Sequence, residues 1–233
     1  MEAGIKETLI GWAEEYNDPK YFQEDPIIFP TKFARKYEEG EAVLADVQIA
    51  GLLAAHLAWG RRAMIVRDCD RMFEEMCWRP YDYVMNGEYR NEDVSLHRTI
   101  KWSQFAQICE NLRNIYTERE SIEGLTDTDI RCRIFGQKED RKAPNKKISM
   151  MRRWLVRDDG KVDLGVWKNS DKNNLILPLD VHVYTRAFEL GMTCRKQKDI
   201  VTAQEITDAF REIWPDDPCK GDFALFGYGV THN

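Results

Sequence analysis

The sequence predicts an all-α fold, and three observations carry this prediction. Apolar residues recur every three or four positions in several segments, which is the spacing of one helix face. Residues with helix-capping chemistry stand where these segments begin and end. The sequence contains no convincing pair of strands and no internal repeat. With 43% hydrophobic and 32% charged residues, the chain has the composition of a globular protein with a core.

The most apolar segment is predicted to be a central helix. Apolar side chains lie at helical spacing within residues 46–59, and the run is apolar on most sides. Such a helix is expected to lie buried between two helical lobes. Gly60 can end it, and the next helix is expected over residues 61–78, stopped by Pro80.

The rest of the chain is expected to alternate between helices and irregular connections. Residues 1–30 hold a short helical stretch, and residues 80–95 and 118–145 are interpreted as mainly irregular. The other predicted helices cover about 99–117, 146–157, 181–190, 202–214 and 218–229. The helix at 202 is predicted from the capping box Thr202-Ala-Gln-Glu205.

The expected organisation is a single helical domain, residues 1–233, made of two lobes. The first lobe covers approximately residues 40–145, and the second, approximately residues 146–233, contains the candidate site. The architecture is thus a two-lobed helical bundle.

Cysteine spacing and the chain's beginning both favour a cytoplasmic protein. The shortest gap between its six cysteines is eight residues, so no C-x-x-C pair of a zinc ribbon is present, and we expect reduced core cysteines. No apolar run reaches the roughly 18 residues of a membrane helix, and the first twenty residues lack a secretion signal. We expect no membrane partner, no cofactor and no metal.

Charge is distributed unevenly along an acidic chain. The net charge is −6, yet residues 131–157 contain ten Lys/Arg and two acidic residues, so this segment is +8 and the remainder −14. Such a basic segment can bind a polyanion at one face. A solvated loop without a ligand explains the charge equally well.

Asp180 is the most informative single residue. It stands between Leu179 and Val181, directly before an amphipathic helix, where a carboxylate accepts backbone N–H bonds and stays ionised. It is either a simple N-cap or a fixed negative charge beside a reacting cation.

Lys146 and Lys147 open another predicted helix. A helix N-terminus and a neighbouring cation both disfavour the ammonium form, and a lysine with a lowered pKa can act as an amine nucleophile. Two solvated lysines are the alternative.

Aromatic residues and histidines give weaker signals. Trp59, Trp154 and His182 are candidates for a base pocket, although tryptophans at this spacing also suit a core. His56 and His182 lack metal-ligand spacing, and the glycines form no phosphate-binding motif.

Together these segments resemble the helix-hairpin-helix DNA glycosylases. Residues 177–183, LPLDVHV, resemble the signature that holds the catalytic aspartate, and residues 146–154, KKISMMRRW, resemble the lysine helix of archaeal 8-oxoguanine glycosylases. Residues 46–65 resemble the first core helix of the superfamily. From about residue 25 to 230 the chain also resembles an uncharacterised bacterial domain-of-unknown-function family that is usually grouped with these enzymes.

Three departures from the glycosylase pattern stand in the same sequence. Residues 160–170, GKVDLGVWKNS, replace the DNA-gripping hairpin, Ala55 replaces a Gln that wedges into the duplex, and the iron–sulfur cysteines of some members are absent.

The resemblance implies DNA repair by removal of a damaged base, including oxidised purines, with a lysine Schiff base and strand cleavage. Lys146 falls on the Schiff-base lysine, Lys147 is the neighbouring candidate, and Asp180 falls on the catalytic aspartate. The flipped base needs an aromatic-lined pocket. The expected nucleic-acid contacts are Arg141, Lys142, Arg152, Arg153 and Lys168.

Two other functions remain open. One is a non-catalytic helical module that binds DNA or RNA, and the other is a helical adaptor for an acidic protein. Steep loss of binding with rising salt would favour a nucleic-acid partner.

Overall fold

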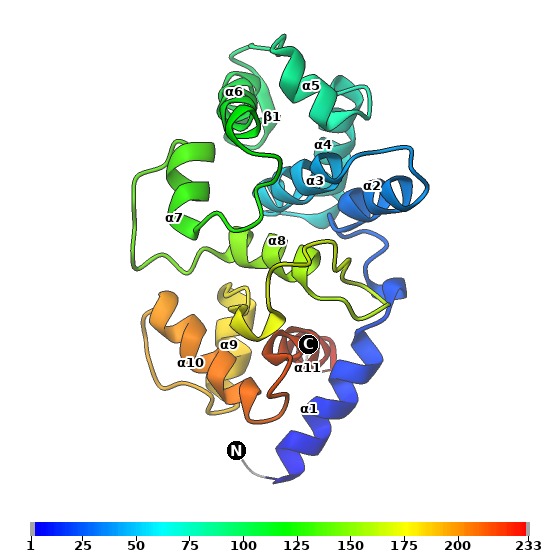
Figure 1. Cartoon of the computed structure of the whole chain (residues 1–233). Helices are drawn as coiled ribbons and strands as arrows, with labels where there is room; N and C mark the ends of the chain where they lie inside the picture. The colour runs from blue at the N-terminus through cyan, green and yellow to red at the C-terminus, as the bar shows by residue number, and fades with distance from the viewer. Residues whose placement is uncertain (1–2, 232–233) are drawn as a thin grey trace. The chain divides into compact units, whose positions relative to one another are not determined.

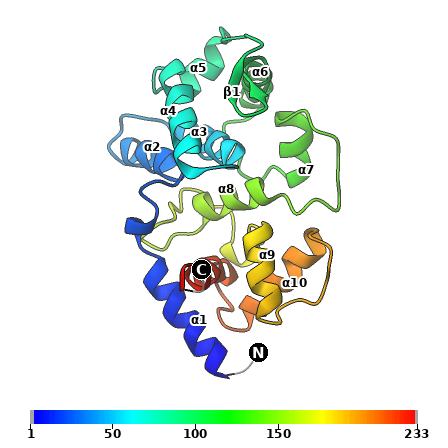
Figure 2. The ribbon, with the colours of Figure 1, turned by 180° about the vertical axis from the view of Figure 1, so that it is seen from behind.

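The computed structural model describes residues 3–231 and consists of helices, irregular connections and one small hairpin (Figures 1 and 2). The all-α prediction is therefore confirmed. The α-helices are α1 (Ala3–Tyr16), α2 (Ile28–Glu38), α3 (Leu44–Leu57), α4 (Arg62–Glu75), α5 (Pro80–Asn86), α6 (Trp102–Glu118), α7 (Asp127–Asp129), α8 (Lys146–Val156), α9 (Val181–Glu189), α10 (Ile200–Arg211) and α11 (Gly221–Thr231). Shorter turns are η1 (Pro19–Tyr21), the π-helical η2 (Ile130–Ile134), η3 (Lys172–Asn174) and η4 (Pro218–Lys220), and the strands are β1 (Ser95–His97) and β2 (Ile100–Lys101). Within residues 3–231, no helix is long and apolar enough to cross a membrane.

The chain forms two compact units. Unit 1 combines Met1–Tyr21 with Asp140–Asn233, and unit 2 is the continuous segment Phe22–Glu139. The first helix thus belongs with the segment that begins at Asp140, whereas the expected lobes were continuous segments beginning near residue 40.

Unit 2 is built around α3, which packs against α2, α4 and α5. Every residue of α3 after Leu44 is buried, as its apolar pattern predicted. The buried Asp46 carboxylate accepts hydrogen bonds from the backbone N–H of Val43, at 3.0 Å, and of Tyr81, at 2.9 Å. It therefore caps α3 and fixes the start of α5. The expectation that this helix lies between two lobes stays a prediction.

Three elements of unit 2 differ from the prediction. Helix α2 was not predicted, α5 occupies part of a segment interpreted as irregular, and the β1–β2 hairpin contradicts the expectation of no strand pair. Pro80 does not only stop α4. It is the first residue of α5, a position where its missing N–H costs nothing.

Unit 1 brings the two ends of the described chain together, because α1 packs along α11 (Figure 1). Gly227 permits this approach, since a Cβ there would lie 2.4 Å from Cδ2 of Tyr16. Helix α9 begins at the cap predicted for it, Asp180, and ends before Gly191 at φ +69°. Helix α10 begins earlier than predicted, because Asp199 rather than Thr202 is its N-cap and accepts from the Thr202 N–H at 3.0 Å.

Candidate functional site

The candidate lysines stand at the start of α8, within unit 1. Asn145 adopts a left-handed conformation, φ +48°, and directs the chain into the helix. Ile148 and Met151 bury the inner face of α8, so the helix is held by its apolar residues. The Lys146 side chain, at the N-terminal end of α8, is 31% exposed.

Asp180 is held at the start of α9 by its own neighbours. Leu177 and Leu179 are buried, and the Leu177 N–H donates to the Thr207 hydroxyl at 3.1 Å. One carboxylate oxygen, Oδ1, caps the helix by accepting from the Val183 N–H at 2.9 Å. The other, Oδ2, lies 3.6 Å from Nζ of Lys146. Two residues that are 34 positions apart in the sequence are thus brought together.

Lys147 differs electrostatically from its neighbour. Burial, and after it the positive charge of Lys146, together lower the pKa of its amine to about 8. A pKa near 8 leaves roughly a tenth of the amines neutral and nucleophilic at pH 7. Lys146 therefore contacts the aspartate, whereas the lowered pKa belongs to the adjacent Lys147.

Asp222, in the first turn of α11, is a third ionisable group of this site that the sequence analysis did not select. Burial raises the pKa of its carboxyl, Arg153 opposes that shift, and the Asp180 carboxylate adds to it. Lys146 also acts on Asp222 electrostatically. The available signal was an aspartate opening the apolar run Phe223–Phe226, where a solvated acid is unexpected.

Arg153 is not the surface contact that the sequence predicted. Its side chain is 6% exposed and forms ion pairs with Asp163 and Asp222. One turn later Arg157, also in the basic segment, is 1% exposed and forms pairs with Asp163, Asp159 and, bidentately at 2.8 Å, Asp217. Buried guanidinium groups must be paired in this way, so these two charges hold the interior of unit 1 together.

The other predicted nucleic-acid contacts lie nearer the surface. Arg141, Lys142 and Lys168 are exposed, and Arg152 is half-buried with its guanidinium 6.0 Å from the Trp167 ring. Lys168 pairs with Asp158 at 3.2 Å. The boundary between the two units falls at residues 139 and 140, so the basic segment is divided between them.

The segment that replaces the DNA-gripping hairpin, residues 160–170, forms no helix. Its backbone folds back on the end of α8, where the N–H groups of Leu164 and Trp167 donate to the carbonyls of Trp154 and Leu155 at 2.7 and 2.8 Å. These two donors are used inside unit 1, so they are not available to a phosphate.

The three residues of the expected base pocket lie in three different environments. Trp154 is a buried core residue of α8, which corrects its assignment as a stacking surface. His182 is exposed on α9. Trp59 belongs to unit 2, where the Arg98 guanidinium lies 4.1 Å from its ring and His97 donates to its carbonyl at 2.9 Å.

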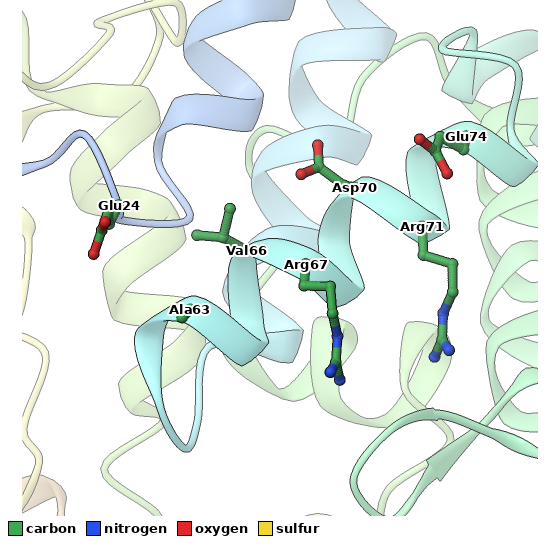
Figure 3. Close-up of a pocket in the computed structure, with 7 residues that line it drawn as sticks. All are labelled: Glu24, Ala63, Val66, Arg67, Asp70, Arg71 and Glu74. Atoms are coloured by element: carbon green, nitrogen blue, oxygen red, sulfur yellow. The ribbon is translucent and has the colours of Figure 1, made fainter.

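Unit 2 carries a shallow pocket along α4 that contains none of the predicted residues (Figure 3). Arg67 and Arg71 point to one side of the helix, and Asp70 and Glu74 point to the other. The lining residues are Glu24, Ala63, Val66, Arg67, Asp70, Arg71 and Glu74. Among residues 3–231, no group of three or more His, Cys, Asp or Glu could hold a metal ion.

The chain matches a family described as "Protein of unknown function (DUF2400)" over residues 25–132 and 126–231. No curated protein and no solved structure matches the chain.

Proposed function

The chain belongs to the DUF2400 family of unknown function, and we propose that it is a DNA glycosylase that removes a damaged base through a lysine amine and an aspartate. The single observation that carries the proposal is the 3.6 Å approach of Lys146 Nζ to Asp180 Oδ2. The resemblance of both segments to helix-hairpin-helix glycosylases supports the same chemistry.

Lys146 supplies the nucleophile in this proposal. Its neutral amine attacks C1′ of the damaged nucleotide, the glycosidic bond breaks, and the base leaves with the bonding electrons and a proton. The sugar opens to a Schiff base with the lysine. Removal of a C2′ proton then expels the 3′ phosphate and cleaves the strand.

Asp180 contributes charge and proton transfer. With Oδ1 engaged as the helix cap, Oδ2 is the oxygen that faces the amine. It can accept the ammonium proton and stabilise the cationic sugar as the base departs. Electrostatic groups of this kind typically change the rate by about 10²–10³-fold.

Borohydride trapping on duplexes that carry oxidised guanine tests the assignment. The wild type should form a covalent protein–DNA adduct and Lys146→Gln should form none, while the exposed Lys161→Gln serves as a matched lysine control. Asp180→Asn keeps a cap-competent oxygen, so it should retain fold and DNA affinity while base release slows about 10²-fold.

The low pKa of Lys147 adds a second arm to this experiment. If the adduct persists in Lys146→Gln and disappears in Lys147→Gln, the nucleophile is the second lysine and the mechanism holds with the register moved by one. Absence of both trapping and base release by the wild type over a panel of lesions rules out the glycosylase.

A non-catalytic nucleic-acid-binding module is the second candidate. The observation that favours it is the exposed part of the basic segment, which can bind a polyanion without any chemistry on a base. The exposed cations Arg141 and Lys142 then serve binding alone. DNA binding that weakens in Arg141→Ser/Lys142→Ser, without any chemistry on a lesion, distinguishes this function.

A further inference from the structure

The loop between α9 and α10 is a second basic segment of unit 1. Residues 191–199 contain Arg195, Lys196 and Lys198, and the only acidic residue of the loop is Asp199. Lys196 and Lys198 are exposed. The chain as a whole is −6, so this concentration of positive charge runs against its composition.

The folded backbone joins this loop to the first basic segment. The N–H of Ile200, the first residue of α10, donates to the carbonyl of Lys142 at 3.0 Å. Figure 1 shows the start of α10 beside the connection that enters α8. The exposed Arg141 and Lys142 are therefore close neighbours of a loop that follows them by more than 50 residues.

Several contacts fix the conformation of the loop. The Thr202 hydroxyl donates to the Gln197 carbonyl at 2.6 Å, and Arg195 pairs with Asp199 at 2.7 Å. The Lys198 ammonium lies 5.0 Å from the centre of the Tyr184 ring, a distance at which the ring attracts a cation. Lys198 is therefore held in place before any ligand arrives.

Tyr184 connects the same loop to the candidate site. Its hydroxyl donates to the Arg195 carbonyl at 2.8 Å, and its N–H donates to the Asp180 carbonyl at 2.9 Å in the first turn of α9. One helical turn thus separates the Lys146–Asp180 pair from the ring that positions Lys198. The loop that carries Lys196 and Lys198 therefore contacts the helix that begins after Asp180, and Arg141 and Lys142 precede Lys146 in the chain.

We propose that the α9–α10 loop is a second contact for the nucleic-acid backbone, made by Lys196 and Lys198 beside Arg141 and Lys142. This inference rests on the proposed nucleic-acid function. A linear polyanion fits the arrangement, because exposed ammonium groups spaced over two segments each meet a separate phosphate, with displacement of counterions. The interaction is independent of base sequence, since contacts to phosphates carry no sequence information.

The test compares variants of equal charge change in the full-length chain. Lys196→Ser/Lys198→Ser should weaken binding of a 20-base-pair duplex roughly tenfold or more at 0.1 M salt, and should lower the slope of log affinity against log salt by about two. Lys20→Ser/Lys161→Ser, which also removes two charges from unit 1, is the control and should leave both quantities unchanged.

Lysine acetylation provides a second measurement on the wild type. Bound duplex should protect Lys196 and Lys198 from the reagent, as detected by mass spectrometry, while Lys161 remains reactive. An acidic polypeptide such as polyglutamate serves as the competing probe.

The results distinguish failure of the loop contact from failure of the proposed nucleic-acid function. If Arg141→Ser/Lys142→Ser weakens DNA binding and Lys196→Ser/Lys198→Ser does not, the loop is no contact and the proposed function stands. If polyglutamate protects the two lysines and duplex does not, the loop belongs to a protein interface and the inference is overturned. If the wild type binds no nucleic acid, both the function and the inference fail.

Discussion

The two ends of α8 carry cations from one basic segment and use them in opposite ways. At the C-terminal end, Arg153 and Arg157 are buried and each is paired with at least two carboxylates. At the N-terminal end, Lys146 is one-third exposed and approaches Asp180 at 3.6 Å. Charge alone did not distinguish these residues. Burial assigns the arginines to stability and leaves the lysines available for a ligand or for chemistry.

The side-chain chemistry of arginine and lysine explains why arginines occupy the buried end of α8 and lysines the more exposed end. Arginine presents a planar fork that binds two carboxylates at once and stays charged when buried. Arg157 uses this geometry in its bidentate contact with Asp217. A lysine loses its proton more easily when it is buried, as the lowered pKa of Lys147 illustrates.

The largest change in the free energy of unfolding is expected at the C-terminal end of α8, where the arginines are buried. Arg157→Met should lower the free energy of unfolding by about 3–5 kcal/mol, because the buried Asp163 keeps only Arg153 and the half-buried Asp217 loses its bidentate partner. Chemical denaturation measures this change. Arg152→Met, on a half-buried side of the same helix, is the control and should cost less than about 1 kcal/mol. Equal losses in both variants would show that burial and ion pairing do not give Arg157 its structural role.

An intermediate effect is expected from the pKa of Lys147. Its folded-state pKa, about 8, lies below the ordinary lysine pKa of 10.5, so between these values the unfolded chain binds more protons than the folded one. Raising the pH through this window should therefore stabilise the wild type relative to Lys147→Met, by at most about 1.4 kcal/mol for each pH unit. Below pH 8 the buried ammonium carries its full cost.

Unfolding titrations of the wild type and Lys147→Met at pH 7, 8, 9 and 10 measure the difference. Lys146→Met is the matched variant of the neighbouring residue. A difference between wild type and Lys147→Met that stays constant over this range would show that burial does not depress the Lys147 pKa.

The smallest effect is expected at the candidate pair itself. Asp180→Ala should cost about 1 kcal/mol through loss of the cap on Val183, and Asp180→Asn should cost less because its side-chain oxygen still caps. Lys146→Gln should change stability by less than about 1 kcal/mol, as exposed ion pairs do. Thermal unfolding supplies the measurement, with Asp199→Ala as a matched cap on α10.

The Lys146 and Asp180 variants also separate a functional role of this ion pair from a structural one. A Lys146–Asp180 contact that contributes little to stability, yet controls trapping, belongs to function. A loss of several kcal/mol in Lys146→Gln would instead make the pair structural, like the arginine network.

Much of the helical pattern was accessible from the sequence because it depends on local spacing. The buried face of α3 follows from its apolar run, and the cap at Asp180 follows from an acid placed before an amphipathic helix. Predictions failed where a local rule had two outcomes. Pro80 can stop one helix or start another, and Thr202 resembled an N-cap although Asp199, three residues earlier, has the same chemistry.

The candidate site was accessible only in part. Asp180 and the two lysines could be selected, since each stands at a predicted helix start. Asp222 was not selected, because its importance lies in its burial beside Arg153 and in the effect of the Asp180 carboxylate on its pKa. The exposure of Lys142 and the burial of Arg153 also could not be separated, because both belong to one run of positive charge.

The sequence by itself determined many of the helical segments, where several of them begin, and which residues can carry acid, base or nucleophilic chemistry. These properties arise from side-chain spacing and from hydrogen bonds over three or four residues. Only the tertiary structure decided that α1 joins the segment that begins at Asp140, that Lys146 meets Asp180, and that Lys142 is bonded to the start of α10. Contacts between distant segments depend on how apolar faces pack, and that packing also decides which charges are buried.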